Sequence, residues 1–335
     1  MIGIEHIEYF LPRRKLTNLE LKKDFPSMDI SKIVQKSGVE SRNIAEEKET
    51  AYDLAVNAIE KLVSLNQFDL NSIDGIIFCT QSPDFIMPSN AFLIHKKFDL
   101  KHNVWAFDIN LACSGYVYGI SIARGMIESG MGSRVLLINA DTYSKHIHSK
   151  DRSTRILFGD GAAVTVLAKN CNNYIQDINL ASSGKDYESF YIPAGGARMP
   201  YSELTSKEIR DFNGNVKTLE NINMNGFAVW KFVSKIVPNQ IKEILSKNNL
   251  RDENIDLYVF HQASKLTLDS LIKSLKIDPK KVFFNIEKIG NTVSASIPIA
   301  LKDAMEEKRI NKNQTVLVSG FGVGLSWGSL VIKFK

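Results

Sequence analysis

The sequence predicts an α/β fold built from two similar halves, and two observations support this. Short apolar segments typical of buried strands alternate along the chain with amphipathic segments typical of helices. Two pairs of segments also match at a nearly constant offset: Asp74 aligns with Asp256, 182 positions away, and Val135 aligns with Val316, 181 positions away. Because both matches preserve the order of helix and strand, they indicate duplication of an α/β unit, whereas either match alone would reflect only the likeness of buried strands.

The first half carries its predicted elements between residues 50 and 167. Residues 72–80, 104–109, 135–140 and 162–167 are short apolar segments, which favour buried strands. Residues 50–65 predict a helix, because one face would hold Leu54, Ala55, Ala58, Ile59, Leu62 and Val63. Residues 114–130 predict a second helix of mostly small and apolar residues, which we expect to be buried on most sides.

The second half repeats this scheme, with strands predicted at 255–260, 315–319 and 327–334 and helices at 225–247, 264–275 and 295–307. Pro238 lies inside the first of these helices, where we expect a kink or a break. The predicted domains are residues 1–170 and 171–335. Residues 182–223 have no counterpart in the first half and mix Gly, Pro and charge, so we expect an insertion at the surface or over the site entrance.

Composition narrows the class of protein. The chain has 335 residues, 44% of them hydrophobic and 24% charged, as is usual for a globular protein. The net charge of +5 fits an acidic partner but is too small to indicate nucleic acid. The N-terminus does not resemble a signal peptide, and no apolar segment approaches the ~18–20 residues of a membrane span. Three cysteines without CxxC spacing suit a reducing cytosol, so we expect a cytoplasmic protein with no membrane partner.

Cys113 lies in the sequence NLACSG, at the turn between a predicted strand and the helix that begins near Ser114. The positive end of a helix dipole favours thiolate, and backbone N–H groups at such a turn can hold an oxyanion. Because free cysteines are often simply buried, this position alone leaves a structural role equally open. Cys79, in mid-strand, and Cys171, at the junction of the halves, lack this placement.

His261 directly follows a predicted strand, at the end where α/β proteins bind ligands, although a structural histidine would also fit. Asn291 lies in a Gly-Asn-Thr turn before a helix and could be a capping residue alone. The internal repeat makes this turn a near mate of the turn at Cys113, so we expect the three residues to converge. The other histidines are expected at the surface: His6, His95, His102, His146 and His148.

Two glycine-containing segments are assigned to turns. Residues 319–326 (SGFGVGLS) lack the Gly-Lys-Ser/Thr ending of a phosphate loop, and a strand rather than a helix is expected to follow. We interpret them as a tight turn that presents backbone N–H groups to a reacting carbonyl. Residues 158–163 (FGDGAA) are interpreted as a structural turn in which Asp160 caps backbone groups. No cluster of metal ligands is expected.

With these motifs, the sequence resembles β-ketoacyl-acyl-carrier-protein synthase III of the thiolase superfamily. NLACSGYVYG, DRSTRILFGDGAA, HQAS, GNTVSASIPIAL and GFGVGLSWGS occur in that family's order and spacing across nearly the whole chain. The resemblance implies a thiolase-like, five-layered αβαβα fold and a homodimer. It also implies an acyltransferase that condenses an acyl-CoA primer with malonyl-acyl-carrier protein and needs no cofactor or metal.

The resemblance also implies roles for individual residues. Cys113 would be the nucleophile that carries the primer acyl group. His261 and Asn291 would donate hydrogen bonds to the malonyl thioester oxygen as CO₂ leaves, and a neutral histidine and an amide can do this without quenching the carbanion. The backbone N–H groups of Cys113 and Val323 would form the oxyanion hole. Val323 stands where the family usually has glycine.

Further residues are assigned to substrate binding by the same resemblance: Lys32, Lys36, Arg152, Trp230, Ser264 and Lys265. Lys32 and Lys36 stand where many members have a tryptophan and an arginine that contact CoA. Ser264 and Leu266 replace an asparagine and a basic residue near the pantetheine. Met87 matches the position that reaches across the dimer to the partner's acyl pocket. These differences favour a longer or unusual acyl primer over acetyl-CoA.

Three alternatives stay open at this point. An enzyme of the same fold could use a non-malonyl acceptor or join two acyl chains, which CO₂ release from malonyl-acyl-carrier protein would distinguish. A cysteine hydrolase could also carry Cys, His and Asn in this order, but no Gln-rich oxyanion segment precedes Cys113. A catalytically silent subunit would not need all three residues intact.

Overall fold

The computed structural model describes residues 1–212 and 214–335; Asn213, inside the predicted insertion, lies outside the described residues. A first sheet has five strands in the order β1-β7-β6-β4-β5. Their bounds are β1 Ile2–Phe10, β4 Gly75–Cys79, β5 Trp105–Ile109, β6 Arg134–Asp141 and β7 Gly161–Lys169. β4 is parallel to both β5 and β6, whereas β7 is antiparallel to β6 and β1. This sheet therefore includes all four strands predicted for the first half, with β1 added at one edge.

The second sheet repeats this order with one strand fewer, β13-β14-β15-β8. Its strands are β8 Asn173–Ser182, β13 Leu257–Phe260, β14 Thr315–Gly322 and β15 Ser326–Phe334. β13 and β14 are parallel, and the other pairs are antiparallel. The segment 319–326, predicted to be a tight turn, is mostly strand, and only residues 323–325 form the turn between β14 and β15.

Strand register shows that the two halves are related. Gly75 of β4 pairs with Val135 of β6, and Leu257 of β13 pairs with Val316 of β14 at the corresponding positions. The aspartates that precede β4 and β13 also act alike. Asp74 accepts a hydrogen bond from the Arg134 N–H, and Asp256 accepts one from the Thr315 N–H. The duplication predicted from the sequence offset is thus visible as equivalent strand pairs.

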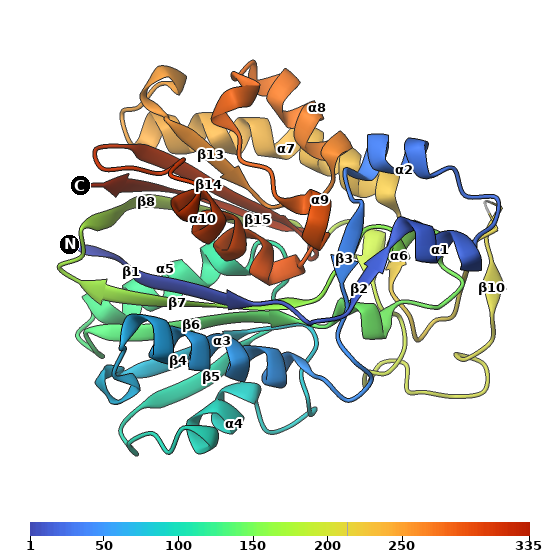
Figure 1. Ribbon diagram of the computed structural model, residues 1–335, viewed down its shortest axis with the longest axis horizontal. Coiled ribbons are helices and arrows are strands. Elements are labelled where there is room, and N and C mark those ends of the chain that lie inside the picture. The colour runs from blue at the N-terminus through green and yellow to red at the C-terminus, as the bar shows by residue number, and fades with distance from the viewer. Residues whose placement is uncertain (213) are drawn as a thin grey trace.

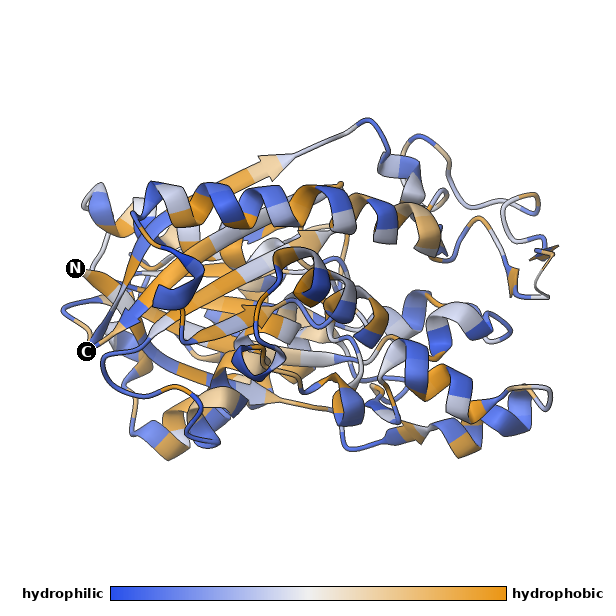
Figure 2. Ribbon diagram, turned by 90° about the horizontal axis from the view of Figure 1, so that it is seen from above, coloured by the Kyte–Doolittle hydropathy of each residue, from blue (hydrophilic) through white to orange (hydrophobic). Residues whose placement is uncertain are grey.

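Three layers of helices enclose the two sheets (Figure 1). α3 (Ala51–Asn66) and α4 (Asn90–Lys97) cover the first sheet, and α7 (Gly226–Lys247) and α8 (Lys265–Leu275) cover the second. α5 (Gly115–Glu128) and α10 (Ser296–Glu306) lie between the sheets, in a core shared by both halves. In Figure 2 the strands are mainly hydrophobic, whereas the outer helices are banded in both colours. Since the middle layer joins both halves, the division into domains 1–170 and 171–335 stays a prediction.

The helices begin where the sequence supplies caps. Thr50 caps α3 with a reciprocal Thr–Asp53 capping box, and Ser264 caps α8 by accepting from the Thr267 N–H. The predicted apolar face of α3 is buried except for Val63, which is exposed because it lies at the margin of that face. Of the kink or break predicted at Pro238, the break is absent: α7 runs through this residue as one helix.

Smaller elements gather at the end of the layers away from the termini (Figure 1). They comprise the helices α1 (Asn18–Asp24), α2 (Ile30–Ser37), α6 (Arg152–Arg155) and α9 (Ile286–Ile289), and the strands β2 (Lys15–Thr17), β3 (Ser41–Asn43), β9 (Phe190–Tyr191), β10 (Ile209–Arg210), β11 (Val216–Lys217) and β12 (Asn223–Met224). β9 to β12 lie in or beside the predicted insertion, as two short antiparallel pairs. In the described part of the chain, no helix is long and apolar enough to cross a membrane.

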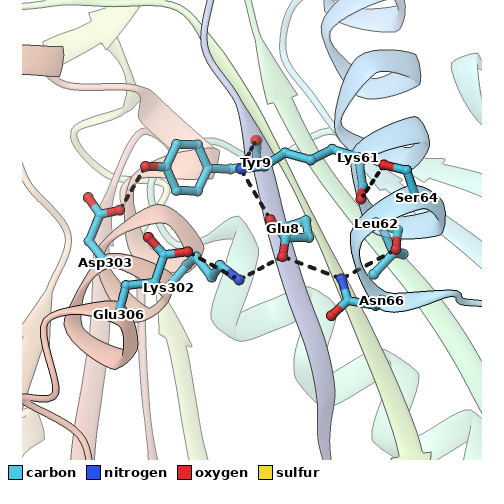
Figure 3. A network of polar contacts seen from close by, with 9 residues as sticks. All are labelled: Glu8, Tyr9, Lys61, Leu62, Ser64, Asn66, Lys302, Asp303 and Glu306. Carbon is cyan, nitrogen blue, oxygen red and sulfur yellow. Dashed lines mark hydrogen bonds and ion pairs between the residues drawn. The ribbon is translucent and has the colours of Figure 1, made fainter.

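A buried ion network ties α3 and α10 to β1 (Figure 3). The Glu8 carboxylate on β1 contacts Lys302 Nζ of α10 at 2.6 Å and Lys61 Nζ of α3 at 3.2 Å. The neighbouring Tyr9 hydroxyl donates to Asp303 of α10 at 2.8 Å. Because the first sheet separates these two helices, the network fixes the outer and middle helical layers to the same strand.

Candidate active site

Residues of α2 and α6 help to line a cavity of about 980 Å³. Cys113, His261 and Asn291 are among its lining residues, and all three are buried. Its outer part is lined by residues of α2, α6, α7, α8 and the β10–β11 hairpin, including Lys32, Arg152, Phe212, Phe227 and Leu266. The structure thus brings the three residues predicted to converge to one tunnel that reaches the surface.

Cys113 lies between β5 and α5, and Ser114 is the N-terminal flanking residue of that helix. The backbone N–H groups of Cys113 and Val323 lie near enough to the sulfur to lower the pKa of the thiol. Burial raises the pKa of Cys113 to about 12, the nearby Asp141 carboxylate adds to the rise, and the two N–H donors oppose it. The thiol is therefore the resting form, and the expected preference for thiolate at this helix end is outweighed by burial.

Two glycines of β14 leave the room that Cys113 occupies. A Cβ at Gly322 would lie 2.8 Å from Cys113 Sγ, and one at Gly320 would lie 2.6 Å from the Cys113 carbonyl oxygen. Real Cβ atoms do not approach other atoms this closely, so larger residues would push the nucleophile away. The Gly-rich stretch of the sequence serves close packing against Cys113 as well as the turn at Val323.

His261 directly follows β13 and is held on two sides. Its Nδ1 lies 2.6 Å from the Ser296 hydroxyl, and its ring packs edge-on against Phe321 with centroids 5.7 Å apart. Burial lowers the pKa of His261 to about 3, so the imidazole is neutral near pH 7. If the Ser296 hydroxyl donates to Nδ1, the ring proton resides on Nε2, the nitrogen nearer to Asn291.

Asn291 is fixed in the turn before α10. Its Oδ1 accepts from the Val293 N–H at 2.9 Å, which supports the positive φ of 55° at that β-branched residue. Its Nδ2 is therefore turned toward the site, 3.4 Å from His261 Nε2 and 3.4 Å from the Ala263 carbonyl oxygen. An amide N–H and an imidazole nitrogen thus stand side by side on the cavity wall.

The residues predicted to bind substrate divide into two groups. Lys32, Lys36, Arg152, Trp230 and Ser264 line the cavity. Among the described residues, Lys36 and Arg152 have no acidic ion-pair partner, whereas Lys32 pairs with Asp29 at 3.6 Å.

Two other predicted residues lie outside that lining. Lys265 pairs with Asp269 at 2.6 Å, so its predicted contact with substrate has no support from the geometry. Met87 is 79% exposed on the loop before α4 and does not line the cavity of its own chain.

A second cavity of about 250 Å³ adjoins the first. Phe190 lines both cavities, and Val323, whose N–H contacts the Cys113 sulfur, lines the smaller one. His146 also lines it; the residue is partly exposed, in keeping with the surface position predicted for it, although its Nε2 is buried. His146 lies in a short helical turn against which the insertion packs, since its carbonyl oxygen accepts from the Ile222 N–H, a contact between segments distant in the sequence.

Sequence reasoning also missed Ser296 and gave no role to Asp141. Asp141, at the end of β6, accepts from the Ser294 hydroxyl at 2.5 Å and from the Gln81 N–H at 2.8 Å. It joins the turn that carries Asn291 to the first sheet, and burial raises its pKa to about 7. Asp160 caps backbone as predicted, accepting from the Ala45 and Ser144 N–H groups. No group of three or more potential metal-binding His, Cys, Asp or Glu side chains occurs among the described residues.

Comparisons with known proteins agree with this geometry. Residues 107–184 match the family model of 3-oxoacyl-[acyl-carrier-protein] synthase III, and residues 245–334 match the model of its C-terminal part. The beta-ketoacyl-[acyl-carrier-protein] synthase III of Caldanaerobacter subterraneus subsp. tengcongensis is 37% identical over 99% of this chain and 98% of its own, and that of Clostridioides difficile is 36% identical over the same shares. A crystal structure of 3-oxoacyl-(acyl-carrier-protein) synthase III superposes with a TM-score of 0.97 at 37% identity, covering 99% of both chains.

The doubled α/β fold, with a cysteine, a neutral histidine and an asparagine on one buried wall, defines a thiolase-like condensing enzyme, an acyltransferase. Within that class, the chain belongs to the β-ketoacyl-[acyl-carrier-protein] synthase III family.

Proposed function

We propose that this enzyme condenses an acyl thioester primer with malonyl-acyl-carrier protein through an acyl-Cys113 intermediate and releases CO₂. One observation carries the proposal: two sets of hydrogen-bond donors occur at one site. The N–H groups of Cys113 and Val323 meet at the sulfur, and His261 stands beside the Asn291 amide on the wall of the same cavity. Two pairs of hydrogen-bond donors suit a reaction in which negative charge develops on two different oxygens, that of the tetrahedral intermediate and that of the enolate.

In the first half-reaction, the Cys113 sulfur attacks the carbonyl carbon of the donor thioester. The bond between that carbon and the donor sulfur breaks, and the donor leaves as a thiol with the proton that Cys113 loses. The N–H groups of Cys113 and Val323 hold the oxyanion of the tetrahedral intermediate. The acyl group is then attached to Cys113, and the emptied tunnel can admit the second thioester.

In the second half-reaction, the bond between the malonyl carboxylate and its methylene carbon breaks, and CO₂ leaves. The electron pair passes to the thioester enolate, whose oxygen accepts hydrogen bonds from His261 Nε2 and Asn291 Nδ2. The neutral state of His261 is suited to this role because an imidazolium would protonate the carbanion. The carbanion attacks the acyl-Cys113 carbonyl, and collapse of the tetrahedral intermediate gives the 3-oxoacyl thioester and the cysteine thiolate, which takes up a proton.

We further propose that acyl-CoA and acyl-carrier protein bind at the tunnel mouth. Lys32, Lys36, Arg152 and Lys217 line its outer part, and this positive charge suits the phosphates of CoA and an acidic carrier protein. The chemistry described above uses side chains and backbone only, and we propose no cofactor. Because a nucleophilic thiol must stay reduced, we propose a cytoplasmic location.

Intact-mass spectrometry after exposure to acyl-CoAs from C2 to C12 tests the first half-reaction. We expect one acyl adduct on the wild type and none on Cys113→Ala. If no acyl donor, CoA-linked or carrier-linked, labels the wild type, the proposed mechanism is overturned.

Release of ¹⁴CO₂ from labelled malonyl-acyl-carrier protein tests the second half-reaction. We expect His261→Ala and Asn291→Ala to keep the acyl adduct and to lose decarboxylation by about 10²–10³-fold, as is usual when one oxyanion donor is removed. Acyl transfer without CO₂ release would instead favour an enzyme of this fold with a non-malonyl acceptor. A cysteine hydrolase is disfavoured because His261 is paired with Ser296 and Asn291 rather than with Cys113.

A further inference from the structure

The turn that carries Val323 packs directly against Cys113. This turn, residues 323–325, joins β14 to β15. A Cβ added at Gly322, the last residue of β14, would lie 2.8 Å from Cys113 Sγ. The backbone N–H groups of Cys113 and Val323, which both lie near the sulfur, therefore come from segments that are distant in the sequence. Their spacing depends on the contacts that hold these two segments together.

Two serine hydroxyls connect the two segments. Ser114 directly follows Cys113, and Ser326 is the first residue of β15, immediately after the turn. The Ser326 hydroxyl donates to the Val323 carbonyl oxygen at 2.7 Å, and Ser114 Oγ lies 2.7 Å from Ser326 Oγ. Because a carbonyl oxygen only accepts, the Ser326 proton is used at Val323, and the Ser114 hydroxyl is the donor between the two serines. One directed chain of hydrogen bonds thus runs from the residue beside Cys113 to the Val323 carbonyl group.

This serine chain is enclosed by protein. Ser114 is fully buried, Ser326 is 3% exposed, and neither is among the described residues that line the two cavities. Away from water, such hydrogen bonds hold their geometry firmly. On its other side the turn is fixed by a backbone pair, since Leu325 and Ser183 exchange N–H to carbonyl hydrogen bonds of 2.8 and 2.9 Å. The backbone pair thus fixes the turn beside the end of β8, and the serine chain fixes it to the Cys113 segment.

We propose that Ser114 and Ser326 are positioning residues for the oxyanion hole: their hydroxyls hold the Val323 N–H at the spacing from the Cys113 N–H that a tetrahedral oxyanion requires. This inference rests on the proposed function, because it concerns the oxygen of the acyl group that Cys113 receives. The two serines act through the backbone and do not touch the substrate. Preorganised donors stabilise a transition state because they need no reorientation during the reaction, and a displacement of about 1 Å can cost about a hundredfold in rate.

The test follows the Cys113 adduct by rapid-quench intact-mass spectrometry, with the acyl-CoA of the C2 to C12 series that labels the wild type fastest. We expect Ser326→Ala to lower the acylation rate at saturating donor by at least about tenfold, because the Val323 N–H is no longer held in place. The donor concentration that gives half the maximal rate should not change, because the serines lie outside the cavities. Ser326→Thr, which keeps the hydroxyl, should retain most of the wild-type rate.

Ser329→Ala is the matched control. Ser329 is fully buried in the same strand as Ser326, and its hydroxyl has no hydrogen-bond partner among the described residues. Its removal should therefore leave acylation unchanged.

Alkylation of Cys113 by iodoacetamide is a second readout, because its transition state develops no oxyanion. The fall in acylation caused by Ser326→Ala should exceed any fall in alkylation by about tenfold. An equal fall in both reactions would show a general disturbance of the sulfur and would overturn the inference.

Thermal melting shows whether each variant is folded. The inference is overturned if folded Ser326→Ala acylates Cys113 at the wild-type rate, if it changes only the donor concentration required, or if Ser329→Ala is slowed as much. If Ser326→Ala does not fold, Ser114→Ala takes its place, because it cuts the chain beside Cys113 while Ser326 still donates to Val323. We expect Ser114→Ala to slow acylation about three- to tenfold, the effect of one ordinary hydrogen bond, and an unchanged rate would overturn the inference. These outcomes leave the proposed function intact, whereas the absence of any adduct on the wild type overturns both.

Discussion

At Cys113, burial and the neighbouring backbone N–H groups shift the pKa of the thiol in opposite directions. Burial and the Asp141 charge raise the pKa of the thiol to about 12, while two backbone N–H groups lower it. The same N–H groups would stabilise the oxyanion of a bound acyl group, whose charge develops only during the reaction. The site is thus better suited to the charge that forms in the transition state than to a resting thiolate.

This balance predicts a pH dependence for modification of Cys113. Below its pKa of about 12, the thiolate fraction rises about tenfold for each pH unit. We expect the rate of Cys113 alkylation by iodoacetamide to rise about a hundredfold from pH 7 to pH 9, without a plateau. Peptide mapping by mass spectrometry separates Cys113 from Cys79 and Cys171, and a plateau below pH 8.5 would contradict the effect of burial.

Gly322 gives a second prediction at this scale. In Gly322→Ala, the new Cβ would meet Cys113 Sγ at 2.8 Å, so the sulfur must move out of reach of the Val323 N–H. We expect acylation of Cys113 to slow at least about a hundredfold, the usual effect of losing one oxyanion donor. Gly125→Ala is the control: Gly125 is exposed in α5 with open space around it, so alanine should leave acylation unchanged and stabilise the helix by up to about 1 kcal/mol. Equal acylation rates in the two variants would contradict the steric argument.

Individual site residues differed in how far the sequence could reveal them. Cys113 and His261 were predictable because each lies in the turn that follows a buried strand, and the internal repeat related the turns of Cys113 and Asn291. Ser296 was not, because a serine near a helix start is ordinary and its contact with His261 spans 35 positions. The contact between His146 and the insertion was also not predictable, because it joins segments distant in the sequence, which local sequence patterns do not encode.

At the scale of elements, the sequence was most informative for buried strands. The predicted strands of both halves are present because continuous apolar segments are recognisable by composition alone. β1 and β8 were missed, since β1 carries Glu5, His6 and Glu8, and β8 lies where the boundary between halves was expected. Each of these strands pairs with a strand more than 100 positions away in the sequence. Ile2 of β1 lies opposite Lys169 of β7, and Ser182 of β8 lies opposite Ser326 of β15.

The Glu8 network is the element-scale feature that stability measurements can test. Burial alone would raise the pKa of Glu8, but the hydrogen bonds and charges of Lys302 and Lys61 outweigh it and lower that pKa. A carboxylate with a lowered folded-state pKa stabilises the protein above its unfolded pKa, near 4.3, and this contribution is lost as the pH falls through the folded value. Near neutral pH the network is therefore at full strength.

We expect Glu8→Gln to lower the free energy of unfolding by about 1–3 kcal/mol at pH 7, because charged hydrogen bonds to Lys302 are lost while Lys61 can still reach water. The difference from wild type should shrink as the pH is lowered from 5 toward 3. Glu128→Gln, which removes an exposed pair with Arg124, should change the free energy by only about 0.3–0.5 kcal/mol. Urea unfolding monitored by circular dichroism measures both, and a Glu8 effect no larger than that control would refute the network's role.

For the whole molecule, the surface of the isolated chain suggests a missing partner. Phe85, Ile86 and Met87 follow one another on one loop with exposed fractions of 56%, 96% and 79%. The loop follows β4, and the neighbouring β5 is the open edge of the first sheet, where unpaired backbone groups favour association. A second copy of the chain would cover such a surface, as in the homodimer that the family resemblance implies, in which Met87 would reach the partner's acyl pocket.

Ile86→Lys is the sharpest test of this assembly. A lysine at the most exposed apolar position of the loop would place an unpaired charge in the interface and weaken association. Sedimentation equilibrium should give the wild type twice the chain mass of 37.6 kDa, and the variant a mass that falls toward one chain at low micromolar concentration. Leu65→Lys is the control, since Leu65 is 66% exposed at the end of α3, outside the proposed contact, and should leave the dimer intact. If the wild type sediments as a monomer, or if both lysine variants remain dimers, the loop is not the contact, and the acyl cavity must be closed by its own chain.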